Sequence, residues 1–585
     1  MVRYEEEQKT IGIIVEELNT DFPRGLIYSV INGIPENKNI RIVVLAGKQE
    51  DIGSQIKQQY CKTYNSIYYI EEMCRFDGLI VALTDMFGRD DTDYGANIFY
   101  NYQNVPKIYV ATEKEGEVTV NYDNEMGIRE AIECLVNING VSKICMLGGR
   151  SENADAVKRK EIFKRVLNDC NLPYSEDLFE TTDMLTACEE EADRLLDRNP
   201  DVGAVFCVND QVAVGLYRSL KKRGLVPGKD VYVFGFDNSF LAGKLIPPLA
   251  SIGSDSITLG QKAIELLIDK MEGKEVESVL VPTRLHGRDS FKYETYDYSS
   301  LDLLNANSDF IYRMFDDCFY RYKDEFSDSA NINLRRLFFE IMSRLLTSLK
   351  NRYLSEEEYI DIERLIDIFF ENGGMAYTDA AQFTASMTKI QGAINYHFRF
   401  ATTVSKVNRL LIKIRDCALR AQSDMMITAG NMYDNERKGL SDFLIEAMNY
   451  QSHQRAFAEN IVKNFGMLGF ENAALYLFKA PRRYEHGRKR TFPESIYLKC
   501  VVRDFELYIV PPDRQKCPVV DIFKREELSK KCRGYVAFPI FYNRVVFGIL
   551  VCELTDEIPE TGEYIADQLG RSIHLNYTDK LTKQI

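Results

Sequence analysis

The sequence lacks the features that mark secreted, membrane-spanning and metal-dependent proteins. No segment approaches the roughly 18 consecutive apolar residues of a membrane span, and the N-terminal residues MVRYEEEQKT have no apolar core of a signal peptide. The 13 cysteines include no Cys-x-x-Cys pair, and the five histidines never cluster. We therefore expect a cytoplasmic protein with reduced thiols, without a metal or cofactor and without membrane contact.

Motifs of the common enzyme classes are also missing. The chain has no Gly-rich phosphate loop, no histidine-kinase phosphoacceptor motif and no Gly-x-Ser-x-Gly nucleophile elbow. No other constellation of a nucleophile with a base emerges, so we do not expect this chain to be an enzyme. A formal net charge of −15 also speaks against a broad nucleic-acid-binding face, because phosphate neutralisation needs clustered Lys and Arg. The basic patches at Arg482-Arg483 and Arg488-Lys489-Arg490 are more typical of solvated loops.

The 585 residues exceed the size of one core and suggest about three to four domains. From Thr10 to about Ser290, strand and helix patterns alternate, which predicts a two-lobed α/β architecture with parallel sheets, helices on both faces and a cleft between the lobes. Within it, the apolar runs Ala204 to Val208 and Val231 to Phe236 end in Asn209-Asp210 and Asp237-Asn238. Because the carboxyl ends of parallel strands line the ligand crevice, both polar pairs should face one cleft.

This part of the chain resembles the effector-binding domains of lac-repressor-type regulators and related periplasmic-binding-protein-like sugar-binding proteins. The resemblance rests on Val208-Asn209-Asp210, on Gly235-Phe236-Asp237-Asn238, on Pro247-Pro248-Leu249 and on the segment VNYDNEMG, in the family's order. It implies that the cleft is lined by seven polar residues, Asp123, Asn124, Asp155, Arg159, Asn209, Asp210 and Asp237. Such a set suits a polyhydroxylated ligand, since carboxylates accept hydrogen bonds from hydroxyls and arginine donates them in a fixed fork. Alternatively, the Asp and Asn residues only cap the following helices, as Asp210 would before Gln211.

The sequence departs from the family pattern at positions that bear on the ligand. Ile162 replaces the glycine of the family's Arg-x-x-Gly-Phe, and Asp183-Met184 stand where many members place an aromatic ring that stacks on the sugar. The chain has no tryptophan, so a stacking platform must be Tyr, Phe or absent. The loop from Asn19 to Arg24 does not align with the family. A small polar ligand is therefore expected, with a carbohydrate as one candidate.

Strand signals disappear after the Tyr-rich stretch from Tyr293 to Tyr298, and helical stripes follow. One stripe repeats apolar residues at alternating spacings of three and four: Val404, Val407, Leu411, Ile414, Ala418, Ala421 and Met425. Three heptads predict a coiled coil that pairs two chains into a homodimer. The alternative is a helix that packs within its own domain, because the alanines of the stripe offer little apolar surface for pairing with a second chain.

The last part of the chain shows a helix, sheet, helix order. Gly534 to Phe541 and Val545 to Glu553 alternate in polarity and are separated by Tyr542-Asn543-Arg544, as in a hairpin, and a helix follows from Thr561 to Leu575. This pattern resembles an α+β GAF-like sensor domain. The tail from Tyr577 to Thr582 resembles the start of GGDEF diguanylate cyclase domains. The expected organisation is a ligand-binding domain at 1–292, a helical linker or dimerisation region at 293–437, a GAF-like domain at 438–576 and a tail at 577–585.

Two functional classes follow. In the first, the chain is the input half of a diguanylate-cyclase-type signalling protein, and ligand binding in the cleft acts through the helical and GAF-like regions on an output domain or partner. In the second, it is a lac-repressor-like transcriptional regulator. The first strand starts near Thr10 and leaves no room for a helix-turn-helix before it, so we expect no direct DNA binding by this polypeptide alone.

Overall fold

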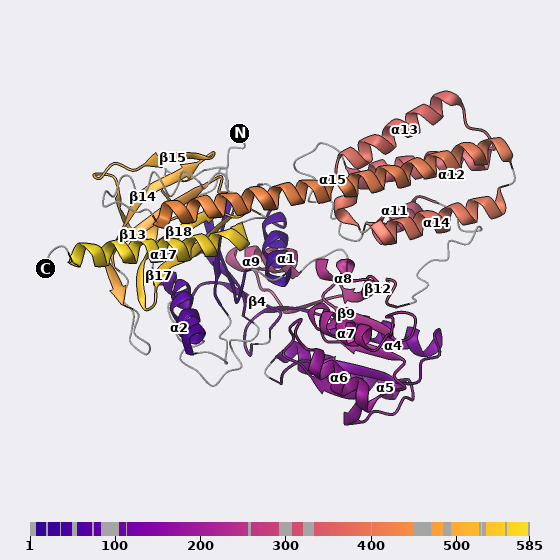
Figure 1. The fold of residues 1–585 in the computed structure, drawn as a ribbon, viewed down its shortest axis with the longest axis horizontal. Coiled ribbons are helices and arrows are strands. Elements are labelled where there is room, and N and C mark those ends of the chain that lie inside the picture. The colour runs from indigo at the N-terminus through magenta and orange to yellow at the C-terminus, as the bar shows by residue number, and fades with distance from the viewer. Residues whose placement is uncertain are drawn as a thin grey trace.

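A computed structural model gives the fold of the chain (Figure 1). The residues that it describes are 8–18, 21–35, 37–48, 55–72, 75–83, 104–112, 114–151, 153–254, 259–291, 307–319, 333–378, 380–398, 400–448, 468, 470–483, 493–525, 528, 534–555 and 558–582. The stretch Tyr293 to Tyr298, the patch Arg488 to Arg490 and the last three residues lie outside them.

The first lobe is built on a parallel sheet. Its strand order is β11 (Val279–Val281), β5 (Thr119–Tyr122), β4 (Lys107–Val110), β3 (Gly78–Ala82), β1 (Lys9–Val15) and β2 (Ile40–Ala46). The central strands are almost entirely apolar and buried, as expected where helices cover both faces. The helical elements of this lobe are α1 (Asp21–Asn32), α2 (Gln55–Tyr64), the 3₁₀ helix η1 (Asn65–Glu72) and α9 (Leu259–Met271).

The second lobe has its own sheet and its own core. The strand order is β12 (Arg284–His286), β10 (Ala250–Gly253), β9 (Tyr232–Phe236), β8 (Ala204–Cys207), β6 (Ile144–Gly148) and β7 (Phe179–Thr181), and only β12 runs antiparallel to its neighbour. Its helical elements are α4 (Asn124–Asn137), α5 (Ala154–Asp169), η3 (Glu176–Leu178), α6 (Glu189–Arg198), α7 (Asp210–Lys222) and α8 (Phe240–Lys244). Two separate apolar clusters underlie the two sheets. The prediction of a two-lobed α/β fold is thus confirmed.

A helical bundle follows, with a third apolar core. It comprises α11 (Ser308–Cys318), α12 (Leu334–Asn351), α13 (Glu356–Glu371), η5 (Gly374–Tyr377), α14 (Ala380–His397) and the first half of α15 (Ala401–Met448). Figure 1 shows α15 leaving the bundle and running on to the C-terminal sheet. The boundary expected at 437/438 therefore falls inside one continuous helix.

The expected coiled-coil seam is not available for pairing over most of its length. Val407, Leu411, Ile414 and Ala418 are at most 5% exposed and belong to the core of the bundle, packed by α12, α13 and α14. The seam leaves the bundle only at Met425, which is 44% exposed. A heptad-like stripe shows only which face of a helix is apolar. In this protein, other helices of the same chain cover that face.

The C-terminal unit is an antiparallel sheet with a long helix. Its strands are β13 (Ala473–Arg483), β14 (Ser495–Arg503), β15 (Glu506–Ile509), β16 (Lys516–Pro518), β17 (Gly534–Tyr542) and β18 (Val545–Glu553), with the 3₁₀ helix η7 (Val519–Asp521) between β16 and β17. The two-residue turn between β17 and β18 starts with Asn543 at a φ of 53°, a conformation that Asn tolerates. The helix α17 (Ile558–Thr582) packs on β17 and β18.

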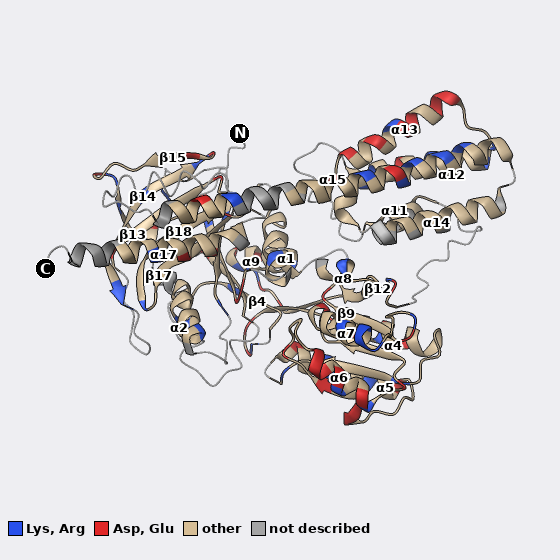
Figure 2. Cartoon of the chain, viewed as in Figure 1, with Lys and Arg blue, Asp and Glu red and all other residues tan. Residues whose placement is uncertain are grey.

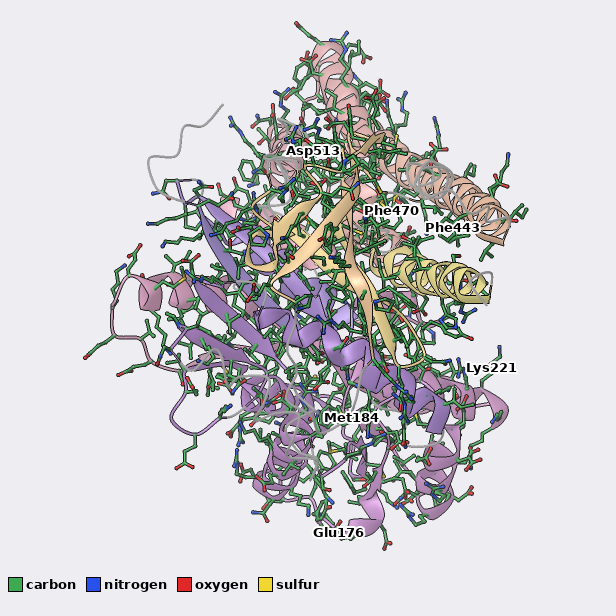
Figure 3. The ribbon with its side chains drawn as sticks, turned by 90° about the vertical axis from the view of Figure 1, so that its left-hand side faces the viewer. Glu176, Met184, Lys221, Phe443, Phe470 and Asp513 are labelled. Atoms are coloured by element: carbon green, nitrogen blue, oxygen red, sulfur yellow. The ribbon has the colours of Figure 1, made fainter. Side chains whose placement is uncertain are left out.

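The C-terminal unit and the first lobe share one sheet. β17 pairs in parallel with β2, so that Gly534 lies opposite Ile42 and Ala537 opposite Leu45. The buried Arg41 of β2 also donates to the carbonyl of Phe523. Figure 3 labels Phe443 of α15 and Phe470, both almost fully buried in the core that the two parts share. The first lobe and the C-terminal unit are therefore one packed body. None of the described helices meets the length and hydropathy of a membrane span.

Candidate functional site

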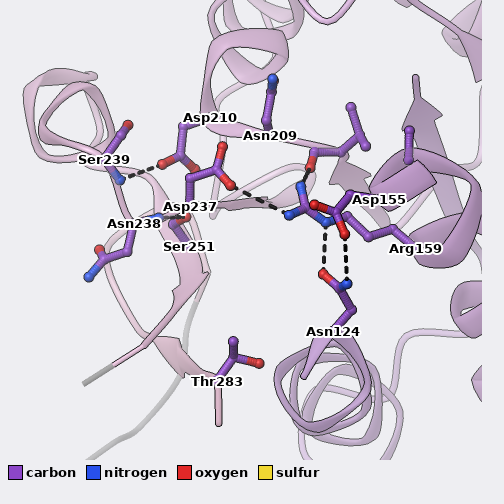
Figure 4. A network of polar contacts seen from close by, with 12 residues as sticks. Asn124, Asp155, Arg159, Asn209, Asp210, Asp237, Asn238, Ser239, Ser251 and Thr283 are labelled. Carbon is purple, nitrogen blue, oxygen red and sulfur yellow. Dashed lines mark hydrogen bonds and ion pairs between the residues drawn. The ribbon is translucent and has the colours of Figure 1, made fainter. Parts of the chain in front are cut away.

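A cavity of about 220 Å³ lies between the two lobes. Both lobes contribute to its wall, because loops at the carboxyl ends of their parallel strands meet there. Five of the seven residues implied by the family resemblance line it: Asp155, Arg159, Asn209, Asp210 and Asp237. Figure 4 shows these side chains, which come from the first two turns of α5, from the start of α7 and the residue before it, and from the end of β9.

Arg159 organises the second-lobe side of the cavity. Its side chain is 4% exposed, its Nε donates to Asn124 Oδ1 at 3.0 Å, and its Nη1 donates to the carbonyl of Val208 at 2.7 Å. The guanidinium also lies 3.6 Å from the centroid of the Phe236 ring, and its Nη2 lies 3.6 Å from Asp237 Oδ1 (Figure 4). These contacts fix the plane of the guanidinium, so that its charged N–H donors are held at the wall of the cavity.

The first turn of α5 places a carboxylate beside this arginine. Asn153 caps the helix by accepting from the backbone N–H of Ala156 at 2.8 Å. Asp155 and Arg159 are four residues apart and so share one helical face. Asn124 Nδ2 donates to Asp155 Oδ1 at 3.3 Å while Asn124 Oδ1 accepts from Arg159. Asn124 thus lies behind the cavity wall and positions two residues that line it.

Capping accounts for two other residues of the expected set. Asp123 accepts from the backbone N–H groups of Glu125 and Met126 at 3.0 and 3.3 Å and caps α4, outside the cavity lining. Asn209 caps α7 through the N–H of Val212 at 3.0 Å, yet it also lines the cavity. The cap of α7 is thus Asn209, and the alternative reading in which Asp210 is the cap is wrong.

Asp210 is a buried structural acid at the edge of the cavity. It is 1% exposed, its Oδ2 accepts from the N–H of Ser239 at 2.8 Å, and its Oδ1 accepts from the hydroxyl of Ser251 at 2.6 Å (Figure 4). Burial, and then the neighbouring charge of Asp237, raise the pKa of this carboxyl to about 7. Its protonated form is therefore populated near neutral pH.

Unusual backbone conformations gather at the cavity. Asp237, Met184 and Ala111 line it and have φ values of 99°, 62° and 54°. Residues other than glycine rarely adopt positive φ, and such conformations persist only where surrounding contacts hold them. For Asp237, a hydrogen bond from its N–H to the carbonyl of Ile252 at 2.8 Å is one such contact.

Several lining residues are not among the seven. Glu16 and Glu17 directly follow β1, and Tyr122 ends β5, so the rule of polar residues at strand ends applies to them as it does to Asp237. Phe22 comes from the start of α1, in the loop region that does not align with the family. Phe22 and Tyr122 are the aromatic side chains of the lining, in a protein without tryptophan. Burial raises the pKa of the Tyr122 hydroxyl.

The lining is rich in carboxylates. Glu16, Glu17, Asp155, Asp183, Asp210 and Asp237 face the cavity, with Arg159 as the one lining cation among the described residues. Two of these carboxylates form ion pairs with cations that do not line the cavity. Lys48 Nζ lies 3.3 Å from Glu17, and Arg150 Nε lies 2.8 Å from Asp183. Carboxylates accept hydrogen bonds from hydroxyl and ammonium groups and repel phosphate. The arrangement suits a ligand that presents several donors. Within the described part of the chain, no group of three His, Cys, Asp or Glu side chains could hold a metal ion.

Residues 138–291 match the family model described as a periplasmic binding protein-like domain. The chain is 28% identical over 210 residues to the HTH-type transcriptional repressor PurR of Vibrio atlanticus, covering 35% of this chain and 60% of that protein. It is 29% identical over 187 residues to the HTH-type transcriptional regulator CelR of Thermobifida fusca, covering 31% and 55%. The chain thus spans about three-fifths of the length of these relatives.

Solved structures that resemble the chain include a complex of the transcriptional regulator CelR with cellobiose, at 25% identity and a TM-score of 0.41, covering 49% of this chain and 86% of that one. A lac repressor dimer bound to operator and the anti-inducer ONPF has 21% identity and a TM-score of 0.39, covering 49% and 95%. Residues 138–291 therefore resemble a periplasmic binding protein-like domain, and about a third of the chain is similar in sequence to transcriptional regulators of the HTH type.

Proposed function

We propose that this chain is the ligand-sensing part of a cytoplasmic regulator, and that a small polyhydroxylated molecule binds in the cavity between the lobes. The observation that carries the proposal is the network around Arg159, in which a buried guanidinium and the carboxylates Asp155 and Asp237 meet at one wall of the cavity. Phe22 and Tyr122 offer apolar ring surface to the carbon skeleton of such a ligand, while the carboxylates accept from its hydroxyls.

Ligand binding in this site acts by changing the angle between the lobes. Glu16, Glu17 and Phe22 belong to the first lobe, whereas Asp155, Arg159 and Asp237 belong to the second. A molecule that contacts both groups binds the closed arrangement better than the open one, so it shifts the population toward closure. Because the first lobe is packed with the C-terminal unit, closure moves the second lobe relative to that combined body.

The output that we propose is control of transcription. The curated relatives are transcriptional repressors and regulators of the HTH type, and the similarity covers 60% and 55% of the length of the two described above. Charged side chains of both signs occur on the described elements, and Figure 2 shows that Asp and Glu predominate on α13 whereas Lys and Arg predominate on α12. This mixture favours contact with DNA through a separate reader, on another segment or on a partner.

The test is the transcript profile of cells that carry the parent protein or its Asp237→Asn variant. The Asp237→Asn variant should no longer respond to the ligand. It should therefore change the levels of the same transcripts that deletion of the protein or addition of the ligand changes. Transcripts that respond to neither deletion nor the variant would contradict a transcriptional output. Ligand binding by the purified protein, measured separately, would then still decide the sensing role.

The C-terminal unit supports a second candidate, the input half of a diguanylate-cyclase-type protein. Its antiparallel sheet with the packed helix α17 is the arrangement expected of a GAF-like domain, and α17 runs without a break through Tyr577–Thr582, the segment that resembles the start of a GGDEF domain. A continuous helix is a direct route from a sensor to a following domain. Formation of cyclic di-GMP from GTP by the full-length gene product, changed by the ligand, would favour this candidate over transcription control.

We also propose that the protein acts as a homodimer. The support is the stretch of α15 between the bundle and the C-terminal sheet, where Met425, Met426 and Ile427 are 44%, 70% and 59% exposed. Met425 continues the heptad stripe beyond the bundle, and Met426 and Ile427 add exposed apolar surface beside it, which suits pairing with a second copy. Light scattering of the parent at micromolar concentrations, compared with a variant carrying Ser at Met425 and Met426, tests this. A parent that remains monomeric at high micromolar concentration contradicts it.

A further inference from the structure

One lysine connects the wall of the cavity to the C-terminal helix. Lys48 follows β2 at the carboxyl end of the first-lobe sheet, and its Nζ lies 3.3 Å from Glu17 Oε1 and 2.7 Å from Glu563 Oε2. Glu17 lines the cavity, whereas Glu563 lies in the second turn of α17. The Lys48 and Glu563 side chains are only 15% and 17% exposed, so their ion pair is weakly screened by solvent.

The position of Lys48 is fixed by its neighbours. Its backbone N–H donates to Asn65 Oδ1 at 2.7 Å, and its carbonyl accepts from Asn65 Nδ2 at 3.0 Å. Its ammonium lies 5.8 Å from the centroid of the Tyr64 ring. The Lys48 side chain is only 15% exposed and its ammonium is within ion-pair distance of both carboxylates, so Glu17 and Glu563 share this one cation.

A second contact holds α17 at the same place. The hydroxyl of Tyr60 donates to Asp567 Oδ2 at 2.8 Å and lies 3.4 Å from Glu563 Oε1. Glu563 and Asp567 are one turn apart and so face the same side of the helix. Tyr60 also packs on Phe541 of β17, with ring centroids 5.3 Å apart. Tyr60 of α2 therefore adds polar contacts to the first turns of α17 and an apolar contact to β17.

We propose that Lys48 transmits occupancy of the cavity to α17. A ligand group that donates to Glu17 competes with Lys48 for that carboxylate, and Lys48 then interacts more fully with Glu563. The result is a first half of α17 that is held more tightly against the first lobe when the cavity is occupied. This inference goes beyond the proposed function because it names the route from the cavity to the C-terminal helix, and it holds for either proposed output.

The route can be tested without knowing the ligand, because Glu17→Gln removes the charge that a bound donor would engage. Amide hydrogen exchange of the whole chain should become roughly threefold slower across residues 558–570 in this variant, the size expected for one strengthened ion pair. Asp183→Asn is the matched control. Asp183 is also a cavity carboxylate in an ion pair, with Arg150 at 2.8 Å, but it belongs to the second lobe.

Three further results decide the inference. In a Glu563→Gln background, the effect of Glu17→Gln on residues 558–570 should disappear, because Lys48 then has no second carboxylate of full charge. Unchanged exchange of this segment in Glu17→Gln, an equal change in Asp183→Asn, or an effect that persists with Glu563→Gln would each overturn the role of Lys48. Glu17 is 34% exposed, so its substitution should leave the fold intact, and the thermal midpoint of the variant checks this.

Discussion

The Nη2 of Arg159 lies 3.6 Å from Asp237 Oδ1, and this pair joins α5 to the end of β9 at the wall of the interlobe cavity. The arginine is 4% exposed and the aspartate 30%, so the aspartate is the more accessible of the two cavity-lining partners. Removing the Asp237 carboxylate should therefore affect mainly ligand binding, whereas removing the Arg159 guanidinium should affect mainly the stability of the fold.

Replacing Asp237 with Asn should weaken binding of the cognate ligand at least about tenfold, because a charge-assisted hydrogen bond worth roughly 1.5–3 kcal/mol becomes a neutral one. Asn suits the test because it tolerates the φ of 99° at this position. Alanine is less suitable, since it would remove the side-chain oxygen beside Arg159 together with the charge, and it rarely adopts positive φ. Calorimetric titration measures the affinity, and Asp201→Asn, at a surface aspartate 72% exposed, is the control. Equal affinity of parent and Asp237→Asn would remove Asp237 from the site.

Replacing Arg159 with Lys should lower the free energy of unfolding by about 2–4 kcal/mol, because lysine cannot donate to both Asn124 and the carbonyl of Val208 from one planar group. Arg165→Lys on the same helix is the control. Arg165 is 53% exposed and pairs with Glu125, so its substitution should change stability by less than about 0.5 kcal/mol. Chemical denaturation of both variants compares them, and similar losses would show that the network around Arg159 adds little.

Asp210 should make stability fall with rising pH. Its pKa is raised to about 7 in the folded chain, above its ordinary value of 3.8, so the folded state binds more protons than the unfolded state between these values. The stabilisation is present in full below about pH 4 and is lost as pH rises toward 7. Asn cannot ionise, so Asp210→Asn should flatten this part of the profile. Thermal midpoints of parent and variant from pH 4 to 8 test this, and parallel curves would contradict it.

Leu411→Ala should destabilise the helical bundle by about 2–5 kcal/mol, because Leu411 is 0% exposed and its truncation leaves a cavity in the core. Its neighbour Ile412 is 49% exposed, and Ile412→Ala should cost less than about 0.5 kcal/mol. If instead Leu411→Ala changed the oligomeric state and left stability unaltered, the seam would be intermolecular after all.

Elements with an unambiguous hydrophobic period could be predicted closely. The runs Ala204 to Val208 and Val545 to Glu553 correspond to β8 and β18, within one residue at each end. The polar residues after β8 and β9 also indicated where the cavity lies. The two strands are parallel, so their carboxyl ends lie at the same edge of the sheet. The same rule covers Glu16, Glu17 and Tyr122, although the divergent loop after β1 gave no family match to draw attention to them.

Long-range pairings could not be predicted from local patterns. β2 and β17 read as ordinary buried strands, and nothing in Ile42 to Leu45 or Gly534 to Ala537 indicates that they pair with each other. In the same way, the stripe through Leu411 and Ile414 shows an apolar face without showing which chain covers it. Periodicity reports that a face is buried, and the partner is set by tertiary packing.

The central claim, a polar ligand held between the lobes, is tested most directly by a thermal-shift screen of sugars, nucleosides and amino acids against the parent and Asp237→Asn proteins. A ligand at a hundred times its dissociation constant adds roughly 2.7 kcal/mol of stability, which is readily seen as a rise in Tm. We predict that at least one polyhydroxylated compound raises the Tm of the parent and fails to raise that of Asp237→Asn at the same concentration. No stabilising compound in these classes, or one that stabilises both proteins equally, would contradict the account.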